Sequence, residues 1–400
     1  MPSIDSNAAL QRFLDLAVIE GPSGREKSVM NKIIEMLTTA GVASDCFQFD
    51  DANTHIRTGG ETGNLIVRIP GTMAGPTTML SAHTDTVPVC VGSVPMVEGN
   101  EVRSGNPASG LGADDRSGCA AMVTAAIELL QSGKPHAPVT LLFCIQEEVG
   151  LYGARYLNRE TLGPIDRAFN FDGGVVEKLT CGAIGGERMT IKVHGIAAHA
   201  GVAPQTGASS IVMASRAIAS LHENGWLGLV DKPGLGVGTA NVGIFNGGDA
   251  TNVITPLVVM RAEARSHDAT MRQRITNEIK SAFENAAATT MNDAGQSGSI
   301  EFEAKLEYES FALPDDDPSV LAGEAAVRAV GRVPYRNISN GGLDANWLYR
   351  HGIRAVTLGC GQKNIHTIHE RLLIADYLDA CRVALHLILS NDISSDAKAT

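Results

Sequence analysis

The sequence predicts an α/β fold that is interrupted by an inserted α+β domain. Three observations lead to this prediction. Short β-type runs alternate with helical segments over residues 1–183, which is typical of a mixed sheet with helices on both faces. Residues 184–312 change to alternating, antiparallel-type strands with two helices. Residues 313–400 then return to a helix, a strand and a helix, so we expect a main domain in two parts around the insertion.

The elements of the main domain follow from hydrophobic runs and turn residues. The first 25 residues indicate a helix that ends at the turn Gly21-Pro22-Ser23-Gly24, and a second helix is expected over 25–40. Short apolar runs predict strands at 64–69, 78–81, 139–145, 169–172 and 355–358. Longer apolar segments predict helices at 119–131, 319–330 and 374–389. The polar tail 391–400 is expected to fray.

The inserted segment is predicted to be a split βαβ unit. Alternating residues predict strands, and longer segments with helical periodicity predict the helices between them. The expected strands are 188–194, 236–245, 257–265 and 299–309, and the expected helices are 208–223 and 269–288. This β-α-β-β-α-β order forms a layer that folds independently of the main domain.

The composition excludes several classes of function. The chain has 44 acidic and 32 basic residues, a net charge of −12, which argues against nucleic acid or an anionic membrane as the main partner. It contains no apolar run of the roughly 18 residues that a transmembrane helix needs. The N-terminal segment also lacks the basic and apolar regions of a signal peptide. The seven cysteines are scattered without a CxxC pair, which indicates reduced thiols and a cytoplasmic protein.

Two strand ends carry acids and histidine in patterns that suit metal binding. His83 and Asp85 follow the 78–81 run, and residues two apart on an extended chain share a face. Asp85 could therefore support the second ring nitrogen of a metal-bound His83. Asp114 and Asp115 follow a Gly-rich loop before the next helix, where they could either bind a ligand or cap the helix.

Three further strand ends carry similar residues. Glu147 and Glu148 end the 139–145 strand, and since neighbours on an extended chain point to opposite sides, they need different functions. Acids and histidines also follow two other strands, at Asp172, His366 and His369. Ligands of α/β sheets bind at the carboxyl ends of strands, and five such ends are hard to explain by helix capping alone.

A charge count favours two metal ions. Asp114, Glu148 and Asp172 supply three negative charges, two neutral histidines add none, and a bridging hydroxide adds one. Two divalent ions balance these charges, as a desolvated site requires. Imidazole and carboxylate ligands with an open position suit two Zn²⁺ ions per subunit, and Mn²⁺ or Co²⁺ would also fit.

The ordered motifs resemble the dizinc exopeptidase family of peptidase T, carboxypeptidase G and succinyl-diaminopimelate desuccinylase. The resemblance extends from about Gly21 to Leu389 and is strongest to peptidase T and related tripeptidases. The motifs that carry it are LGADDRSG, QEEVGLYGA, FNFDGG, NGGLDA and IHTIHE. It implies that 1–183 and 313–400 form a metal-binding catalytic domain and that 184–312 forms a lid or dimerisation domain.

The resemblance also implies the metal ligands. Asp114 would bridge both zinc ions. His83 and Asp172 would complete the first site, and Glu148 and His366 the second.

The same resemblance selects between neighbouring residues. The bridging acid of the family is the first of its acidic pair, and its last ligand is the first histidine of H-x-x-H-E, so Asp115 and His369 are not expected to be ligands. Glu147 matches the general base, and Asp85 matches the residue that orients the first histidine. A cis peptide bond is implied between the two acids of the pair.

Substrate-binding residues are implied mainly in the inserted domain. His199 matches a histidine that relatives present to the active site, often from a partner subunit. Asn252 and Arg265 match residues that hold the substrate backbone or its terminal carboxylate. Gly341 and Gly342 resemble a loop that lines the substrate cleft. Relatives often have Pro at the position of Thr255, and this departure affects no ligand.

The expected function is therefore a two-metal hydrolase of short peptides, a tripeptidase-like aminopeptidase in which Glu147 activates a metal-bridging water. A carboxypeptidase or an N-acyl-amino-acid deacylase of the same family is the alternative, because it would share every ligand. A non-enzymatic, metal-bound scaffold is a third hypothesis. The expected partners are a short peptide and a second copy of the chain that binds through the inserted domain, with neither nucleic acid nor membrane.

Overall fold

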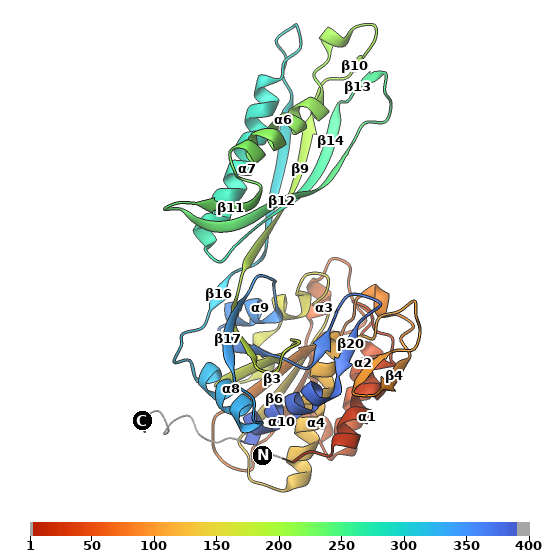
Figure 1. The fold of residues 1–400 in the computed structure, drawn as a ribbon, viewed down its shortest axis with the longest axis vertical. Coiled ribbons are helices and arrows are strands. Elements are labelled where there is room, and N and C mark those ends of the chain that lie inside the picture. The colour runs from red at the N-terminus through yellow and green to blue at the C-terminus, as the bar shows by residue number, and fades with distance from the viewer. Residues whose placement is uncertain (1–2, 390–400) are drawn as a thin grey trace. The chain divides into compact units, whose positions relative to one another are not determined.

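The computed structural model describes residues 3–389, which divide into two compact units (Figure 1). The first unit holds the chain up to Gly182, Ala312–Ser339 and the residues from Leu343 onward. The second holds Ala183–Phe311 and Asn340–Gly342. The segment Asn340–Gly342, expected in the main domain, groups instead with the second unit, where the Tyr308 ring lies directly on Gly342. The tail 391–400, predicted to fray, lies outside the described residues.

A mixed sheet forms the centre of the first unit. Its strands are β1 (Phe47–Phe49), β2 (Leu65–Ile69), β3 (Thr78–His83), β6 (Val139–Cys144), β7 (Arg167–Phe171), β8 (Lys178–Ala183), β16 (Phe311–Ala312), β17 (Tyr335–Ser339) and β18 (Ala355–Leu358). They follow the order β1-β2-β6-β3-β7-β18-β8-β16, and β17 pairs with β8. Strands β6, β3, β7 and β18 run parallel, with antiparallel strands flanking them. The parallel strands are buried along their whole length, as expected for a sheet covered on both faces.

Helices pack on both faces of this sheet, as the sequence predicted. They are α1 (Ser6–Ala17), α2 (Lys27–Thr39), α3 (Ala52–His55), α4 (Ala113–Ser132), α5 (Tyr152–Arg155), α8 (Pro318–Ala329), α9 (Asp344–Arg350) and α10 (Ile374–Leu389). Gly323 of α8 lies against the Phe169 ring on one face. Side chains alternate along a strand, so Asn170 of β7 points to the other face of the sheet. The strand register places Cys144 of β6 on that same face. There Asp344 of α9 lies beside Cys144.

Helix α4 carries the acidic pair at its start. The predicted helix 119–131 begins six residues earlier than expected, at Ala113. Asp114 and Asp115 depart from helical φ/ψ values, and the peptide bond between them is cis, as the resemblance implied. The small side chains of this Ala-rich helix let it pack closely against β3 and β7, which fixes its first turn near the ends of these strands.

A second sheet of the first unit was not predicted from the sequence. It consists of β4 (Pro95–Glu98), β5 (Glu101–Ser104), β19 (Gln362–Lys363) and β20 (Arg371–Leu373), in the order β19-β20-β5-β4. Because β19 pairs antiparallel with β20, the chain between them closes into a loop. His366 lies in this loop.

The second unit is a five-stranded antiparallel sheet with two helices. The elements are β9 (Gly185–His194), α6 (Ser210–Glu223), β11 (Gly228–Lys232), β12 (Gly236–Gly247), β14 (Leu257–Ser266), α7 (Ala269–Thr289) and β15 (Ser299–Tyr308). The strand order is β11-β12-β14-β9-β15, which is the predicted split βαβ unit with β11 added. Both helices pack on the sheet around one apolar core. A short pair, β10 (Ala198–His199) with β13 (Val253–Ile254), completes the unit.

Within residues 3–389, no helix combines the length and the apolar character that crossing a bilayer requires.

Candidate active site

The carboxyl ends of the parallel strands bring together seven of the predicted residues. Strand β3 ends at His83, and β7 ends one residue before Asp172. Because parallel strands end at one edge of the sheet, the loops that follow them lie next to each other. The residues gathered at this edge are His83, Asp85, Asp114, Glu147, Glu148, Asp172 and His366.

Asp114 lies between two imidazoles. Its Oδ1 is 3.2 Å from Nε2 of His83, and its Oδ2 is 3.2 Å from Nε2 of His366. Asp172 approaches the first imidazole, with 3.9 Å between its Oδ1 and His83 Nε2. Glu148 approaches the second, with 3.0 Å between its Oε2 and His366 Nε2. The carboxylate of Asp114 therefore faces the imidazoles of both His83 and His366.

Asp85 orients the first imidazole. Its Oδ1 lies 3.3 Å from Nδ1 of His83, which leaves Nε2 directed toward Asp114. Ser23 donates its hydroxyl proton to Oδ2 of Asp85 over 2.6 Å. Burial opposes ionisation of Asp85, but the hydrogen bonds from His83, from Ser23 and from backbone N–H groups lower its pKa below the ordinary value.

Asp115 and His369 do not join the cluster. Asp115 accepts hydrogen bonds from the backbone N–H groups of His83 and Gly118, each at 3.2 Å. Its carboxylate therefore holds the start of α4 to the end of β3. His369 belongs to neither group of candidate ligands found among residues 3–389. Asp114 and His366 are the members of the two pairs that belong to the candidate ligand groups.

The turn that carries Glu147 and Glu148 is held through its backbone. Asp85 accepts the N–H groups of Glu147 at 3.0 Å and of Glu148 at 3.2 Å. Glu26 accepts the N–H group of Gln146 at 3.1 Å and that of Gly24 at 2.7 Å. Burial raises the pKa of Glu147 well above its ordinary value, which suits a carboxylate that takes up and releases a proton.

Sequence reasoning did not assign a function to Glu26, Gln362 or Glu370, which also surround the cluster. Nε2 of Gln362 lies 3.4 Å from Oδ1 of Asp114. Glu370 accepts the backbone N–H of Asp114 at 3.0 Å. Glu370 ends the IHTIHE motif, and Glu26 follows the Gly21–Gly24 turn, so position within these motifs was the only available signal.

The charge and the donors of this cluster fit divalent cations. His83, Asp114 and Asp172 form one group of ligand atoms within 4.8 Å of one another, and Asp114, Glu148 and His366 form a second. The two groups share Asp114. The carboxylates favour positive charge here, since Asp114 and Glu148 raise the pKa of His366 to about 10. Imidazole and carboxylate donors suit Zn²⁺, Mn²⁺ or Co²⁺.

In the second unit, His199 and Asn252 lie together. Strand β10 pairs with β13, and His199 lies opposite Val253, the residue after Asn252. The backbone N–H of Ala200 donates to the carbonyl of Asn252 at 2.9 Å. Nδ1 of His199 accepts the backbone N–H groups of Gly201 and Val202, each at 3.2 Å. A ring nitrogen that accepts carries no proton, so Nε2 of His199 carries it and can donate.

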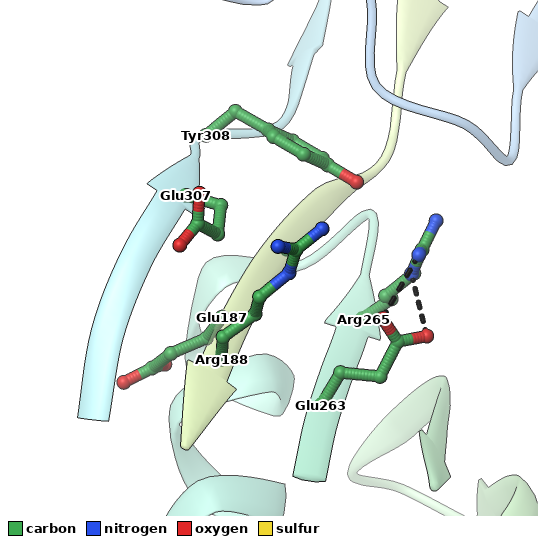
Figure 2. A pocket seen from close by; sticks show the side chains of 7 residues that line it. Glu187, Arg188, Glu263, Arg265, Glu307 and Tyr308 are labelled. Atoms are coloured by element: carbon green, nitrogen blue, oxygen red, sulfur yellow. Dashed lines mark hydrogen bonds and ion pairs between the residues drawn. The ribbon is translucent and has the colours of Figure 1, made fainter. Parts of the chain in front are cut away.

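Arg265 lies at the other end of the same unit. Figure 2 shows it beside Arg188 and Tyr308, around a narrow pocket of about 10 Å³. Glu263 accepts two hydrogen bonds from Arg265, at 3.0 Å from Nε and 2.9 Å from Nη2. Gly186 lies opposite both Arg265 and Tyr308 in the strand register, and the Tyr308 ring lies directly over it, so that a Cβ atom there would come within 2.9 Å of the ring. The other end of the Arg265 guanidinium stays available to an anionic or carbonyl group.

Gly341 and Gly342 also belong to the second unit. A Cβ atom on Gly342 would come within 2.6 Å of the Tyr308 ring, so only glycine fits there. The structure therefore places this predicted pair next to the aromatic wall of the Arg265 pocket.

Comparison with known proteins assigns the chain to a family. The sequence pattern described as Peptidase family M20/M25/M40 matches residues 79–390. The uncharacterized protein YqjE of Bacillus subtilis (strain 168) is 32% identical over 386 residues, which cover 96% of this chain and 98% of YqjE. The chain belongs to this peptidase family. Membership confirms the predicted resemblance and the prediction that the protein is a hydrolase of peptides.

Two solved structures resemble the chain along most of its length. The aminopeptidase PepT from Bacillus cereus ATCC 10987 has a TM-score of 0.85, and a tripeptidase from Staphylococcus aureus subsp. aureus Mu50 has one of 0.87. Each is 30% identical and covers 96% of this chain and 98% of its own. A probable carboxypeptidase of Uncinocarpus reesii is 28% identical over 303 residues, covering 70% of this chain and 66% of that protein.

The stretch that matches the M20/M25/M40 peptidases contains all the candidate ligands and Glu147. Ser23 and Glu26 precede it, although they hydrogen-bond to Asp85 and to Gln146 within the site. The N-terminal turn of this family member therefore belongs to the same structural unit as the acids that it supports.

Proposed function

We propose that this peptidase is a two-metal aminopeptidase that releases the first residue of short peptides. The observation that carries the proposal is the shared carboxylate of Asp114, which faces an imidazole on each side while Glu147 lies next to Glu148. Similarity to an aminopeptidase and a tripeptidase over 96% of the chain supports the substrate class.

The proposed metal ligands are those of the two groups that share Asp114. His83 and Asp172 would hold one ion with it, and Glu148 and His366 the other. Zinc is the proposed metal, because neutral imidazole and carboxylate are its usual donors in catalytic sites. Bound divalent ions would lower the pKa of a water molecule and polarise the scissile carbonyl.

Glu147 is the proposed general base. It would take a proton from the attacking water and pass it to the departing amine, so that the peptide C–N bond breaks and a neutral amine leaves. Burial, which raises the pKa of Glu147, makes its carboxylate a stronger base for the first half of this transfer. Asp85 would keep the proton of His83 on Nδ1 and leave Nε2 as the metal-binding nitrogen.

His199 is the proposed donor to the carbonyl oxygen of the substrate. The backbone N–H groups of Gly201 and Val202 favour the form of the ring that has its proton on Nε2. A donor directed at the developing oxyanion typically contributes about 10²–10³ in turnover. Asn252 and Arg265 are proposed to hold the substrate, and Gly341 and Gly342 to line its path.

We further propose that the protein works as a homodimer. His199 and Asn252 lie beyond the Leu257 end of β14, whereas Arg265 lies at its other end. Arg265 follows Leu257 by eight positions along the strand, which corresponds to about 26 Å. A tripeptide spans about 10 Å, so one short substrate cannot reach both from a single chain. A second copy that supplies His199 and Asn252 removes this conflict.

We propose the cytoplasm as the compartment. The seven cysteines are all free, and six of them are buried. Free thiols persist in reducing compartments.

The test is mass-spectrometric analysis of one tripeptide with both ends free, beside its N-acetylated and its C-amidated forms. Zinc-loaded protein should release the first residue of the free and the amidated peptide, and a chelator should stop the reaction. Cleavage of the acetylated but not the amidated peptide would instead support a carboxypeptidase or deacylase. Protein with two bound ions that cleaves none of the three would contradict the aminopeptidase proposal and favour the scaffold hypothesis.

A further inference from the structure

Glu370 lies between the loop that precedes Asp114 and the loop that carries His366. Both loops hold ligands of the second group. Its side chain is only 2% exposed. Oε2 accepts the backbone N–H of Gly112 at 2.6 Å, and Oε1 accepts that of Asp114 at 3.0 Å. The thiol of Cys90 also donates to Oε2 at 3.3 Å. Each carboxylate oxygen of Glu370 is therefore bound to the segment that carries the shared aspartate.

The loop before Asp114 depends on an acceptor of this kind. Gly112 has a φ of +78°, a left-handed conformation, and the first residues of α4 lack helical geometry. N–H groups at the start of a helix have no carbonyl partner within it, and burying them unpaired is costly. Gly110 has no room for a side chain, because Cβ would lie 2.8 Å from the Thr367 carbonyl and 3.2 Å from Oε2 of Glu370. The loop is thus closely packed around this carboxylate.

The same residue is tied to His366. Glu370 follows it by four positions, and the backbone N–H of Glu370 donates to the carbonyl of Thr367 at 3.2 Å. His366 itself has a φ of +64°, so its backbone is held in a conformation that side chains rarely adopt. The turn around it is closed by Thr367, whose hydroxyl donates to the Asn364 carbonyl at 2.7 Å.

Two of the three ligands in the second group are therefore positioned through Glu370. The first group has other supports, since His83 is oriented by Asp85 and the backbone N–H of Asp172 donates to the Leu358 carbonyl. Asp114 is common to both groups. Loss of Glu370 should thus affect the second group more than the first.

We propose that Glu370 is a positioning residue that sets the distance between Asp114 and His366 and thereby the affinity of the second metal ion. This proposal rests on the two-metal function proposed above. Glu370 does not reach the metal site itself, because both of its oxygens are used by backbone N–H groups. Its effect passes through the backbone of the ligands that it holds.

The test is a titration of metal-free protein with Co²⁺, whose visible absorption reports the coordination of each ion. Glu370→Gln offers an NH₂ group where one N–H needs an acceptor, so we expect the affinity at the second site to fall 10- to 100-fold, as for other residues that orient metal ligands. The first site should lose less. Glu370→Asp keeps the charge but is one methylene shorter, and it should recover part of the loss. If the glutamine variant does not fold, the aspartate variant carries the test.

Asp317→Asn is the matched control. Asp317 is also buried and accepts the backbone N–H of Ser319 at 2.9 Å, but it lies at the amino end of α8 and beside Arg354, before β18 begins. It should lower the unfolding temperature without changing either Co²⁺ affinity. Unchanged Co²⁺ affinities in both Glu370 variants, with two ions bound by the natural protein, would overturn the proposal for Glu370 alone. A natural protein that binds fewer than two ions would overturn the two-metal function and this proposal with it.

Discussion

Buried carboxylates serve two separate purposes in this site. Asp114, Asp172 and Glu148 direct their oxygens at imidazole nitrogens, as ligands of a shared cation would. Glu26 and Glu370 direct theirs at backbone N–H groups and so fix the segments that carry the first set. Residue type alone does not separate these purposes, because both need a buried, ionised or hydrogen-bonded oxygen.

Glu147→Gln tests the chemical step at the scale of one residue. The amide has the same size but cannot take a proton, so turnover of a tripeptide should fall about 10²–10⁴-fold. Both metal ions should remain, because Glu147 is not a proposed ligand. Steady-state kinetics with metal analysis of the same sample measure both. Glu160→Gln, on the exposed surface of the first unit, is the control. A variant with near-normal turnover would exclude Glu147 as the base.

Glu26 should make stability depend on pH. Burial, together with repulsion from Asp85, raises its pKa from 4.5 to about 7, although hydrogen bonds from Gly24 and Gln146 oppose the shift. Below pH 4.5 the carboxyl group is protonated in both states. As the pH rises to about 7, only the unfolded chain releases the proton. The native protein therefore loses roughly 3 kcal/mol of stability through this group.

Glu26→Gln removes this dependence, because an amide does not titrate. Between pH 4.5 and pH 8, the free energy of unfolding of the variant should rise by roughly 3 kcal/mol relative to that of the natural protein. Any cost of the altered hydrogen bonds is the same at both pH values and cancels in this comparison. Urea unfolding of both metal-free proteins at the two pH values measures the difference. A constant difference across this range would show that Glu26 ionises normally in the folded state, as the nearby charge of Arg116 favours.

At the scale of elements, the contact of α4 with β7 links the fold to the site. Gly118 of α4 lies directly on the carbonyl of Phe171, the last residue before Asp172, and beside the carboxylate of Asp115. No side chain fits between this helix and this strand. The acidic pair at the start of α4 and the acid after β7 therefore stay close only while the helix packs at this short distance.

Gly118→Ala should push α4 from β7. Overpacking typically costs about 1–3 kcal/mol, and here the displaced groups adjoin Asp115 and Asp172, so metal affinity should fall as well. Gly323→Ala in α8 is the matched control, because the nearest atom to its Cβ would be the flexible end of Leu179, at 3.1 Å, and the Phe169 ring would lie at an ordinary contact distance of 3.6 Å. Urea unfolding and Co²⁺ titration of both variants make the comparison. Equal effects at the two positions would contradict a specific role for the α4–β7 contact.

At the scale of the whole molecule, the site residues are distributed over two compact units. The candidate metal ligands and Glu147 all belong to the first unit, and His199, Asn252 and Arg265 belong to the second. Within the second unit, strand β14 separates the first two of these from the third. The distance along this strand is the physical basis for proposing that two copies of the chain combine to form one complete site.

Mixing two inactive variants tests this arrangement. Dimers of Glu147→Ala lack the base in both sites, and dimers of His199→Ala lack the donor in both. If His199 acts on the partner's site, a mixed dimer has one complete site, and equal mixing in a symmetric dimer should restore about a quarter of the natural activity. The measurement is tripeptide turnover after subunit exchange. No recovery, with exchange shown by mass spectrometry, would mean that His199 acts within its own chain.

The agreement between the predicted and the observed elements has a physical reason. Apolar runs long enough to be buried on both faces predicted β6 and β18 closely, and periodic apolar residues predicted α10 from Ile374 to Leu389. Strands β4, β5, β19 and β20 have two to four residues and are partly exposed, so no hydrophobic pattern marks them. The start of α4 was placed too late because the glycines around Asp114 and Asp115 indicate a loop, and these two residues do depart from helical φ/ψ values.

The sequence by itself determined the kinds of residue at each strand end and therefore the donors available to a metal, since apolar runs and the acids that follow them are local features. Only the tertiary structure decided how these residues are used. It brings Glu370 onto the backbone of Asp114 across 256 positions of sequence. It also separates His199 from Arg265 along β14. Such contacts depend on the packing of distant segments, and no local pattern records them.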